Sequence, residues 1–255
     1  MNQVVVIIGL GEMGSIFARG LLRLGHPVYP VARDTDMAAF CKNIPQPKIV
    51  LVAVGEADLQ PTLEQIPAEW RTKIVLLQNE LLPRDWLPHH FENPTVISVW
   101  FEKKKGQDAK VLIPSPAYGP NAALISNALA TLDIPVKELV TANELELELV
   151  IKNVYILTTN ISGLVIGGTV DDLWCKNEAL AREVANDVID IQEKMTGNSY
   201  NREQLINGMV NAIDGDRAHK NMGRSAPARL NRAIQQADEF KLEVKKLREI
   251  AALQT

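Results

Sequence analysis

Apolar and polar residues follow one another in short blocks along the first half of the chain. The continuous β-branched run Val4–Ile8 is typical of a strand that is buried on both faces of a parallel sheet. A helical pattern runs from Met13 to Leu22 and stops at Gly25. Further strands are expected at 28–31, 49–54, 74–77 and 96–100. This alternation predicts an α/β domain of the Rossmann type, with a doubly wound parallel sheet.

The pattern becomes helical after Tyr118-Gly119-Pro120. One helix is expected at 121–132, followed by a short edge strand at 134–140. Later helices are expected at 144–159, 177–195 and 201–213. The last helix should begin at Ser225-Ala226-Pro227, with the serine hydroxyl as its cap, and continue through Ile250. The predicted domains are residues 1–140, a Rossmann-type α/β domain, and residues 141–255, an all-α domain.

Composition and charge argue against a nucleic acid, a membrane or a metal ion as a partner of this chain. The chain has 255 residues, of which 46% are hydrophobic, and a net charge of −4. Because the basic residues are scattered, we expect no nucleic-acid partner. No signal-peptide pattern precedes the first strand, and 154–170 is interrupted by polar residues and glycines, so we expect a cytoplasmic protein without a membrane partner. The histidines and the two cysteines lack metal-ligand spacing, so no metal site is expected.

A glycine-rich turn, Gly9-Leu10-Gly11-Glu12-Met13-Gly14, joins the first strand to the first helix. In a dinucleotide-binding unit the first glycine makes the turn, the second lets the backbone approach the pyrophosphate, and the third lets helix and strand pack closely. The start of the helix then offers free N–H groups to the phosphates. The motif has the required context of a buried strand followed by a helix, and it predicts a dinucleotide site.

The residue after the second strand distinguishes the two nicotinamide cofactors. An acidic residue there would bind the ribose hydroxyl of NAD, whereas Arg33 suits the 2′-phosphate of NADP(H), although Asp34 adjoins it. Val54 ends the third predicted strand, Gly55 follows it, and Asn79 follows the fourth. These three residues should border the nicotinamide ribose, because ligands bind at the carboxyl ends of such strands.

One lysine in the helical half is a candidate acid. Hydride transfer to a carbonyl group leaves negative charge on oxygen, so a proton donor is needed there. Lys152 stands in an otherwise apolar helical stretch, and Asn160 follows eight residues later, within roughly 80° around the helix. A lysine in such surroundings either extends to solvent or faces a polar cleft, and the sequence leaves both alternatives open.

The chain resembles the ketopantoate reductase (2-dehydropantoate 2-reductase) family. The resemblance rests on the glycine-rich turn, Leu77-Gln78-Asn79, Tyr118-Gly119-Pro120, and the helix with Lys152 and Asn160. It implies a Rossmann domain joined to a helical domain, and an NADP(H)-dependent oxidoreductase that acts on a small 2-oxo acid or related carbonyl. In the family, the residue that matches Asn79 binds cofactor and substrate, the one that matches Lys152 protonates the carbonyl oxygen, and an asparagine corresponds to Asn160.

The chain departs from the family pattern at several positions. Asn79 is followed by Glu80 where the family has glycine, and Ile156 stands where the family has an asparagine. Ala233 occupies the position of a substrate-binding glutamate, and arginines at 224, 229 and 232 crowd that region. If one of these arginines lines the site, a substrate that is anionic at a second position, where the family's substrate has a hydroxyl group, is expected; otherwise the arginines decorate an exposed helix.

Three functions therefore remain open. The first is the NADP(H)-dependent reductase, with Lys152 as general acid and Asn79 and Asn160 orienting the substrate. The second is a catalytically inactive NADP(H)-binding sensor or interaction protein, because the missing polar residues remove contacts that a specific site needs. The third resembles 3-hydroxyisobutyrate dehydrogenase, but Glu144–Val150 lacks the glycines of that family. A homodimer is also an open alternative.

Overall fold

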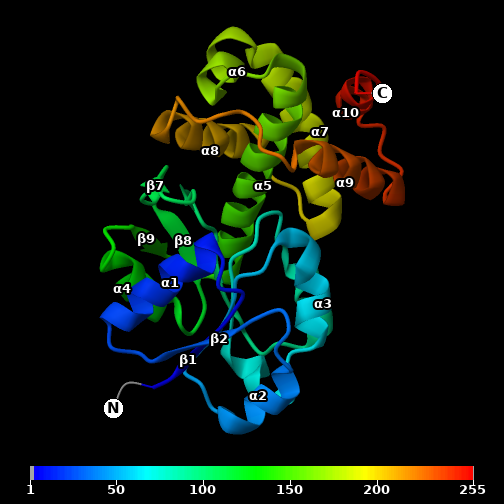
Figure 1. Cartoon of the computed structure of the whole chain (residues 1–255). Helices are drawn as coiled ribbons and strands as arrows, with labels where there is room; N and C mark the ends of the chain where they lie inside the picture. Colours follow the sequence, from blue (N-terminus) through cyan, green and yellow to red (C-terminus); the bar gives the residue numbers. More distant parts are fainter. Residues whose placement is uncertain (1–2, 255) are drawn as a thin grey trace. The chain divides into compact units, whose positions relative to one another are not determined.

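The structure is a computed structural model that describes residues 3–254. The chain forms two compact units that divide between Glu148 and Leu149 (Figure 1). The sequence-based boundary at 140/141 lies a few residues earlier, just before helix α5 (Ala142–Ile166) begins. Each unit is described in turn.

The first unit is built on a seven-stranded sheet with the order β2-β1-β3-β4-β5-β8-β9. Every neighbouring pair is parallel except β5 and β8, which are antiparallel. Strands β6 and β7 form a separate antiparallel pair. The strand bounds are β1 Val5–Ile8, β2 Val28–Val31, β3 Val50–Val52, β4 Ile74–Leu76, β5 Thr95–Ile97, β6 Phe101–Glu102, β7 Lys110–Val111, β8 Ser115–Tyr118 and β9 Val136–Glu138.

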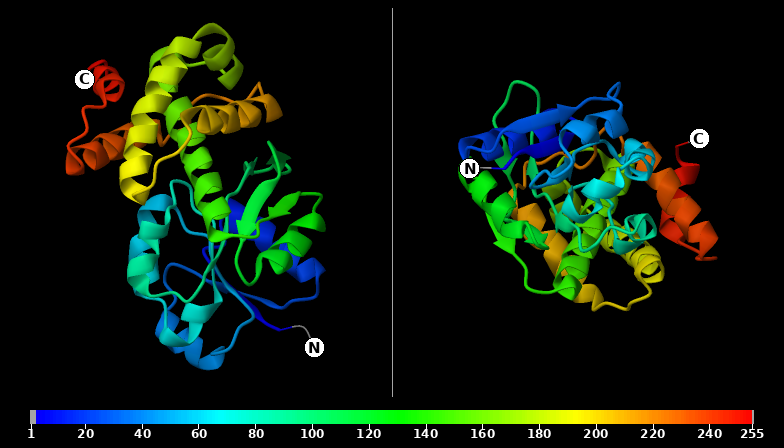
Figure 2. Two further views of the ribbon diagram at one scale, coloured as in Figure 1. Left: turned by 180° about the vertical axis from the view of Figure 1, so that it is seen from behind. Right: turned by 90° about the horizontal axis from the view of Figure 1, so that it is seen from below.

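Helices cover both faces of this sheet. The helix bounds in the first unit are α1 Glu12–Arg23, α2 Met37–Asn43, α3 Leu59–Glu64 and α4 Ala122–Ala130, with short 3₁₀ turns at Glu56–Asp58, Ala68–Lys73, Pro83–Asp85 and Leu87–His89. Helices α1 and α4 lie side by side, because Gly20 lets the two backbones approach closely at Ala128 (Figure 2). Helices α2 and α3 lie on the other side of the sheet (Figure 1).

The burial of strand β1 on both faces explains why the apolar run Val4–Ile8 is unbroken in the sequence. Val5 and Ile7 of β1 belong to the core cluster that also contains Phe17 of α1 and Ile125 of α4. The alternate residues of β1 are equally buried on the opposite face. A strand covered on both faces has no polar side, which produces an unbroken apolar run instead of an alternating one.

Two features of this unit were not predicted. Strand β8 reads Ser-Pro-Ala-Tyr, and it lies inside the sheet between β5 and β9. Pro116 lacks an N–H group for the ladder, and the segment has no β-branched residue, so the pattern argued against a strand. The β6–β7 hairpin has only two residues in each strand, too few for alternation to show. The sheet is therefore mostly, not wholly, parallel.

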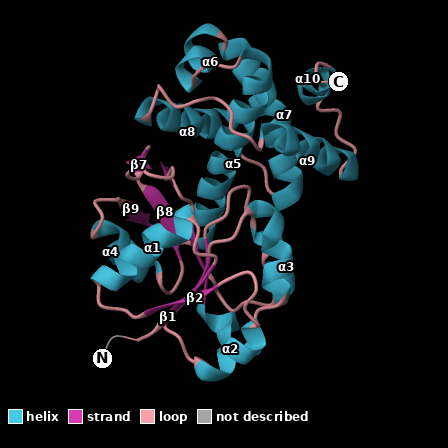
Figure 3. Ribbon diagram, viewed as in Figure 1, coloured by secondary structure: helices cyan, strands magenta, loops and turns pink. Residues whose placement is uncertain are grey.

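All regular elements in the described part of the second unit are helices, as Figure 3 shows by colour. The main part of α5 packs with α6 Val170–Lys176, α7 Glu178–Thr196, α8 Arg202–Gly215, α9 Ala226–Glu239 and α10 Lys245–Ala252. Every residue of α5 from Asn153 to Gly163 is buried, as in the central helix of a bundle. Helix α7 ends at Gly197, which has a φ of +74° and makes the expected left-handed cap.

Two expectations for the end of the chain are wrong. The single last helix is instead two, α9 and α10, because the chain turns at Lys241 and Val244, with φ values of +57° and +36°. Neither residue is a glycine, so no stop signal was visible in the sequence. The Ser225 side chain makes no capping hydrogen bond, because its backbone already has helical angles that carry the hydroxyl away from the first N–H groups.

The expectation that no stretch is apolar enough to cross a membrane also needs correction. Among the described residues, α5 passes by length and composition, with a mean hydropathy of 1.5 over its best window. Of that window, 72% is buried inside the molecule, as in the core helix of a globular domain. The sequence prediction considered only residues 154–170, whereas α5 begins at Ala142, so the apolar stretch was not recognised.

Candidate active site

The glycine-rich turn has three glycines in three distinct surroundings. Gly9 has a φ of +87°, and a Cβ there would lie 2.9 Å from the Ala53 carbonyl oxygen. A Cβ on Gly14 would lie 2.1 Å from the Gly9 carbonyl oxygen, so only glycine fits at that position. A Cβ on Gly11, by contrast, would meet no protein atom within 4 Å. The turn thus needs Gly9 and Gly14 for its own packing, but it does not need Gly11.

The open space at Gly11 fits a bound pyrophosphate. Gly11 is the N-cap residue of α1 and makes no side-chain cap, so the first N–H groups of the helix remain available. Leu10 and Glu12 are exposed beside it, while Met13 is half-buried. Without a side chain at residue 11, an anion can reach the helix terminus directly. The residues present therefore fit a dinucleotide at this turn.

The site lies where the order of the strands reverses. Strand β1 has β2 on one side and β3 on the other, so the chain switches direction across the sheet at the β1–β3 boundary. The glycine-rich turn follows β1, and Val54 and Gly55 follow β3. The Cβ position of Gly9 would be 3.2 Å from Val54 Cγ1, which brings the two segments together. Open α/β sheets bind ligands at this kind of switch point.

Arg33 follows the edge strand β2 and is available to a ligand. Its side chain is 91% exposed, and its guanidinium lies 3.1 Å from the Asp58 carboxylate. An exposed pair of this kind is weak and is easily exchanged for a doubly charged phosphate. Asp34, which adjoins it, is also exposed.

Of the two amide-bearing residues after β4, Gln78 has a structural role and Asn79 is available to a ligand. Gln78 is buried and donates from Nε2 to the Val52 carbonyl oxygen at 2.7 Å, so it ties β4 to β3. Asn79 is exposed, and the described part of the chain provides no hydrogen bond to its side chain. The Asn79 amide is therefore free to bind a ligand.

Glu80 keeps the backbone shape of a glycine. Its φ is +60°, in the left-handed region that costs a residue with a side chain about 1 kcal/mol. Replacing it by glycine (Glu80→Gly) should stabilise the protein by about 0.5–1 kcal/mol, measured by urea unfolding. Glu80→Ala is the matched control, because alanine removes the carboxylate but keeps the Cβ. Equal stability of the two variants would contradict the backbone explanation.

A basic residue that the sequence reasoning did not select lies near the glycine-rich turn. The ammonium group of Lys103 is 3.4 Å from the Glu12 carboxylate, and the Lys103 side chain is only 20% exposed. The β6–β7 hairpin, which the pattern did not show, carries this lysine to the start of α1.

In the second unit, Lys152 lies on α5 with its ammonium 6.0 Å from the centroid of the Tyr155 ring. Burial in the first place, and the positive charge of Arg229 in the second, lower the Lys152 pKa from 10.5 to about 7. A lysine with this pKa exchanges its proton near neutral pH, which is the property required of a general acid.

Asn160 and Arg229 form a hydrogen-bonded group further along α5. The Asn160 side-chain oxygen accepts from Arg229 Nη1 at 3.0 Å and from the Gly223 backbone N–H at 3.2 Å. Its Nδ2 donates to the Ile156 carbonyl oxygen at 2.9 Å. Asn160 is therefore used to hold the segment before α9 and the Arg229 side chain against α5.

Two of the departures from the family pattern, Ile156 and Ala233, are in the interior. Lys152, Ile156 and Asn160 are spaced by four residues and lie along one side of α5, with Ile156 buried between the two polar residues. Ala233 is 1% exposed, and Arg229, one turn earlier on the same face of α9, is 9% exposed. Arg224 is exposed and Arg232 is half-buried. Sequence reasoning selected all three arginines but had no means of identifying the buried one.

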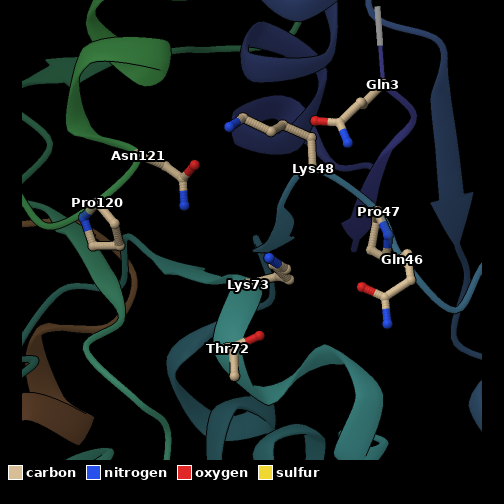
Figure 4. A pocket seen from close by; sticks show the side chains of 8 residues that line it. All are labelled: Gln3, Gln46, Pro47, Lys48, Thr72, Lys73, Pro120 and Asn121. Carbon is tan, nitrogen blue, oxygen red and sulfur yellow. The ribbon is translucent and has the colours of Figure 1, made fainter.

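A separate polar cavity of about 280 Å³ lies in the first unit, and Figure 4 shows the side chains around it. Lys48 and Lys73 come from segments that precede β3 and β4, whereas the predicted cofactor residues follow strand ends. The cavity thus opens at the opposite edge of the sheet from the glycine-rich turn. It is lined by Gln3, Gln46, Pro47, Lys48, Thr72, Lys73, Pro120 and Asn121.

Comparison with protein-family models and with curated protein sequences found no match. Solved structures are similar over the whole chain. Among them is 2-dehydropantoate 2-reductase from Methylococcus capsulatus, with a TM-score of 0.68 and 13% identity, covering 98% of this chain and 95% of that one. A dimeric ketopantoate reductase from Staphylococcus aureus has a TM-score of 0.66 and 17% identity, covering 98% and 96%.

A third similar structure is D-mandelate dehydrogenase in complex with NADH, with a TM-score of 0.66 and 11% identity, covering 98% of this chain and 97% of that one. At these identities the comparison concerns the path of the chain and not the chemistry. The predicted fold class is confirmed: this chain has the fold of the ketopantoate reductases, with a doubly wound α/β unit followed by a helical unit.

Proposed function

We propose that this protein is an NADP(H)-dependent oxidoreductase that reduces a small 2-oxo acid or related carbonyl compound, with Lys152 as general acid. The observation that carries the proposal is the lowered pKa of Lys152 in a helical unit that follows an intact dinucleotide turn. The fold similarity to two kinds of nicotinamide-linked oxidoreductase supports the same conclusion.

The first unit holds the cofactor in this proposal. Gly11 and the start of α1 bind the pyrophosphate, Arg33 binds the 2′-phosphate, and Val54, Gly55 and Asn79 border the nicotinamide end. When bound, NADPH supplies the hydride that adds to the carbonyl carbon of the substrate. The neighbouring Leu10, Glu12 and Met13 contribute backbone, and Glu12 orients Lys103.

The second unit supplies the proton. The Lys152 ammonium donates a proton to the carbonyl oxygen as negative charge develops there, and the neutral amine then takes a proton from solvent. Because the lysine is buried beside another cation, its protonated form is destabilised, which makes it a stronger acid than a solvated lysine. Asn160 fixes the surroundings of Lys152 through Arg229 and Gly223.

The exposed guanidinium of Arg33 should determine the choice of cofactor. Replacing it by glutamine (Arg33→Gln) should weaken NADPH binding about tenfold to a hundredfold, because charge-assisted hydrogen bonds to the 2′-phosphate are lost. Binding of NADH should change by less than about twofold. Fluorescence titration with both cofactors measures this, and Arg19→Gln, at an exposed arginine further along α1, is the control. Equal losses for both cofactors would contradict the assignment of Arg33.

One observation favours a second candidate function. Ile156 and Ala233 are buried at positions where the family that the chain resembles has an asparagine and a substrate-binding glutamate. A protein that keeps the cofactor site but lacks those groups would be an NADP(H)-binding sensor. Tight NADPH binding without oxidation of NADPH across a panel of 2-oxo acids and imines would select this alternative.

A further inference from the structure

We infer that Arg229 is the receptor for the substrate carboxylate, so that the site accepts 2-oxo monocarboxylic acids and discriminates against neutral carbonyl compounds of the same shape. This inference rests on the proposed function and adds to it a residue that determines specificity. The argument has three steps, which concern the burial of Arg229, its position and its charge.

Arg229 is a buried side chain that is held in a fixed place. It is 9% exposed, which is unusual for an arginine, and its Nη1 donates to Asn160 Oδ1 at 3.0 Å. Asn160 is itself buried and is fixed by the Gly223 N–H group and by its own bond to Ile156. A guanidinium carries five N–H donors in a planar fork, and this geometry matches the two oxygens of a carboxylate.

The position of Arg229 concentrates positive charge beside Lys152. Arg229 lies in the first turns of α9, where the unsatisfied N–H groups of the helix add a partial positive charge. The guanidinium is held by Asn160, which follows Lys152 by eight residues on the same side of α5, and its positive charge is the second cause, after burial, of the lowered Lys152 pKa. Two cations and a helix N-terminus in one partly dehydrated region attract an anion strongly.

Charge balance indicates one carboxylate and not two. A monocarboxylate on Arg229 neutralises the guanidinium and leaves the single positive charge of Lys152. Hydride addition to the carbonyl carbon produces one negative charge on oxygen, and the Lys152 proton cancels it. The product is then a 2-hydroxy acid, with its carboxylate still on Arg229 and Lys152 neutral. A second carboxylate would leave an uncompensated negative charge in the interior, which is costly.

The direct test compares 2-hydroxyisovalerate with its neutral amide as ligands, by calorimetry, on the protein with and without saturating NADPH. These pairs do not react, because cofactor and ligand are both reduced. The acid should bind at least about tenfold more tightly than the amide. Binding of the acid should also take up protons at pH 7, measured from two buffers of different ionisation enthalpy, because the carboxylate offsets the charge of Arg229 and thereby raises the Lys152 pKa.

Two variants and a control refine the test. Arg229→Gln should weaken binding of the acid about thirtyfold and abolish its advantage over the amide, while NADPH affinity stays within about twofold. Arg229→Lys keeps the charge without the fork and should give an intermediate loss. Arg224→Gln is the control, at an exposed arginine just before α9, and it should leave the affinity for both the acid and the amide unchanged.

The outcomes separate this inference from the proposed function. Equal binding of acid and amide to the wild-type protein, with or without NADPH, would overturn the assignment of Arg229 even if no variant folds. Retention of the acid preference in folded Arg229→Gln protein would overturn it too. Failure of the protein to bind NADPH at all would instead contradict the proposed function, whatever the two ligands do.

Discussion

Replacing Lys152 by methionine should lower the rate of NADPH oxidation with an accepted 2-oxo acid by about a thousandfold, because general acid catalysis contributes a factor of this order. The dissociation constant of NADPH should stay within about twofold, since no cofactor residue is changed. Lys152→Arg should be equally inactive, because arginine keeps the positive charge but cannot give up a proton near neutral pH. Lys194→Met, at an exposed lysine of α7, is the matched control.

The same substitution should stabilise the folded protein. The pKa of Lys152 is about 7 when folded, against 10.5 for a solvated lysine, so the unfolded chain binds more protons between these two pH values. Stability of the wild type therefore rises as the pH rises from 7 towards 10. Methionine removes this dependence, and its stabilising effect should be larger at pH 7 than at pH 9 by about 2 kcal/mol.

Thermal unfolding of the wild type and Lys152→Met at both pH values measures this difference, and Lys194→Met should show none. A normal rate in the methionine variant would exclude Lys152 as the acid. A stabilising effect that does not depend on pH would show that Lys152 is not titrating near neutrality.

Substituting alanine at Gly11 and at Gly14, two of the three glycines of the glycine-rich turn, should have different consequences. Gly11→Ala should leave the melting temperature nearly unchanged, because its backbone φ is −78° and the new Cβ would meet no protein atom within 4 Å. It should weaken NADPH binding about a hundredfold, since the methyl group occupies the space needed by the pyrophosphate. Gly14→Ala should destabilise the fold by about 3 kcal/mol or more, because its Cβ would lie 2.1 Å from the Gly9 carbonyl oxygen.

Circular dichroism melting and NADPH fluorescence titration on the two variants measure these effects. A stable Gly11→Ala protein with wild-type NADPH affinity would show that the dinucleotide does not use this turn. Unfolding of Gly11→Ala would show that the glycine serves the fold.

The fold of the first unit was largely predictable from sequence because its physical requirements are local. A strand buried on both faces gives an unbroken apolar run, and the turn after it admits only glycine at Gly9 and Gly14. Strand β8 was not predicted, because it is stabilised by its neighbours in the sheet and not by the strand preference of its own residues. A proline-containing segment such as Ser115–Tyr118 has no strand pattern of its own.

The contacts between different helices of the second unit could not be predicted from sequence. Spacing along one helix placed Lys152 and Asn160 on one side of α5, and the structure adds that Asn160 is engaged by Gly223 and Arg229. The contact between Asn160 and Arg229 joins residues 69 positions apart, and no periodicity of the sequence predicts it. The burial of Arg229 likewise depends on how α9 packs, so the three arginines at 224, 229 and 232 looked equivalent in the sequence.

The central claim is that this protein uses NADPH to reduce a 2-oxo acid. The most direct measurement follows the absorbance of reduced nicotinamide when purified protein, in excess over NADPH, is mixed with each member of a series of 2-oxo monocarboxylic acids. The claim predicts loss of the absorbance with at least one acid, dependence on Lys152, and formation of the matching 2-hydroxy acid. NADPH that is bound but remains reduced with every acid would contradict it.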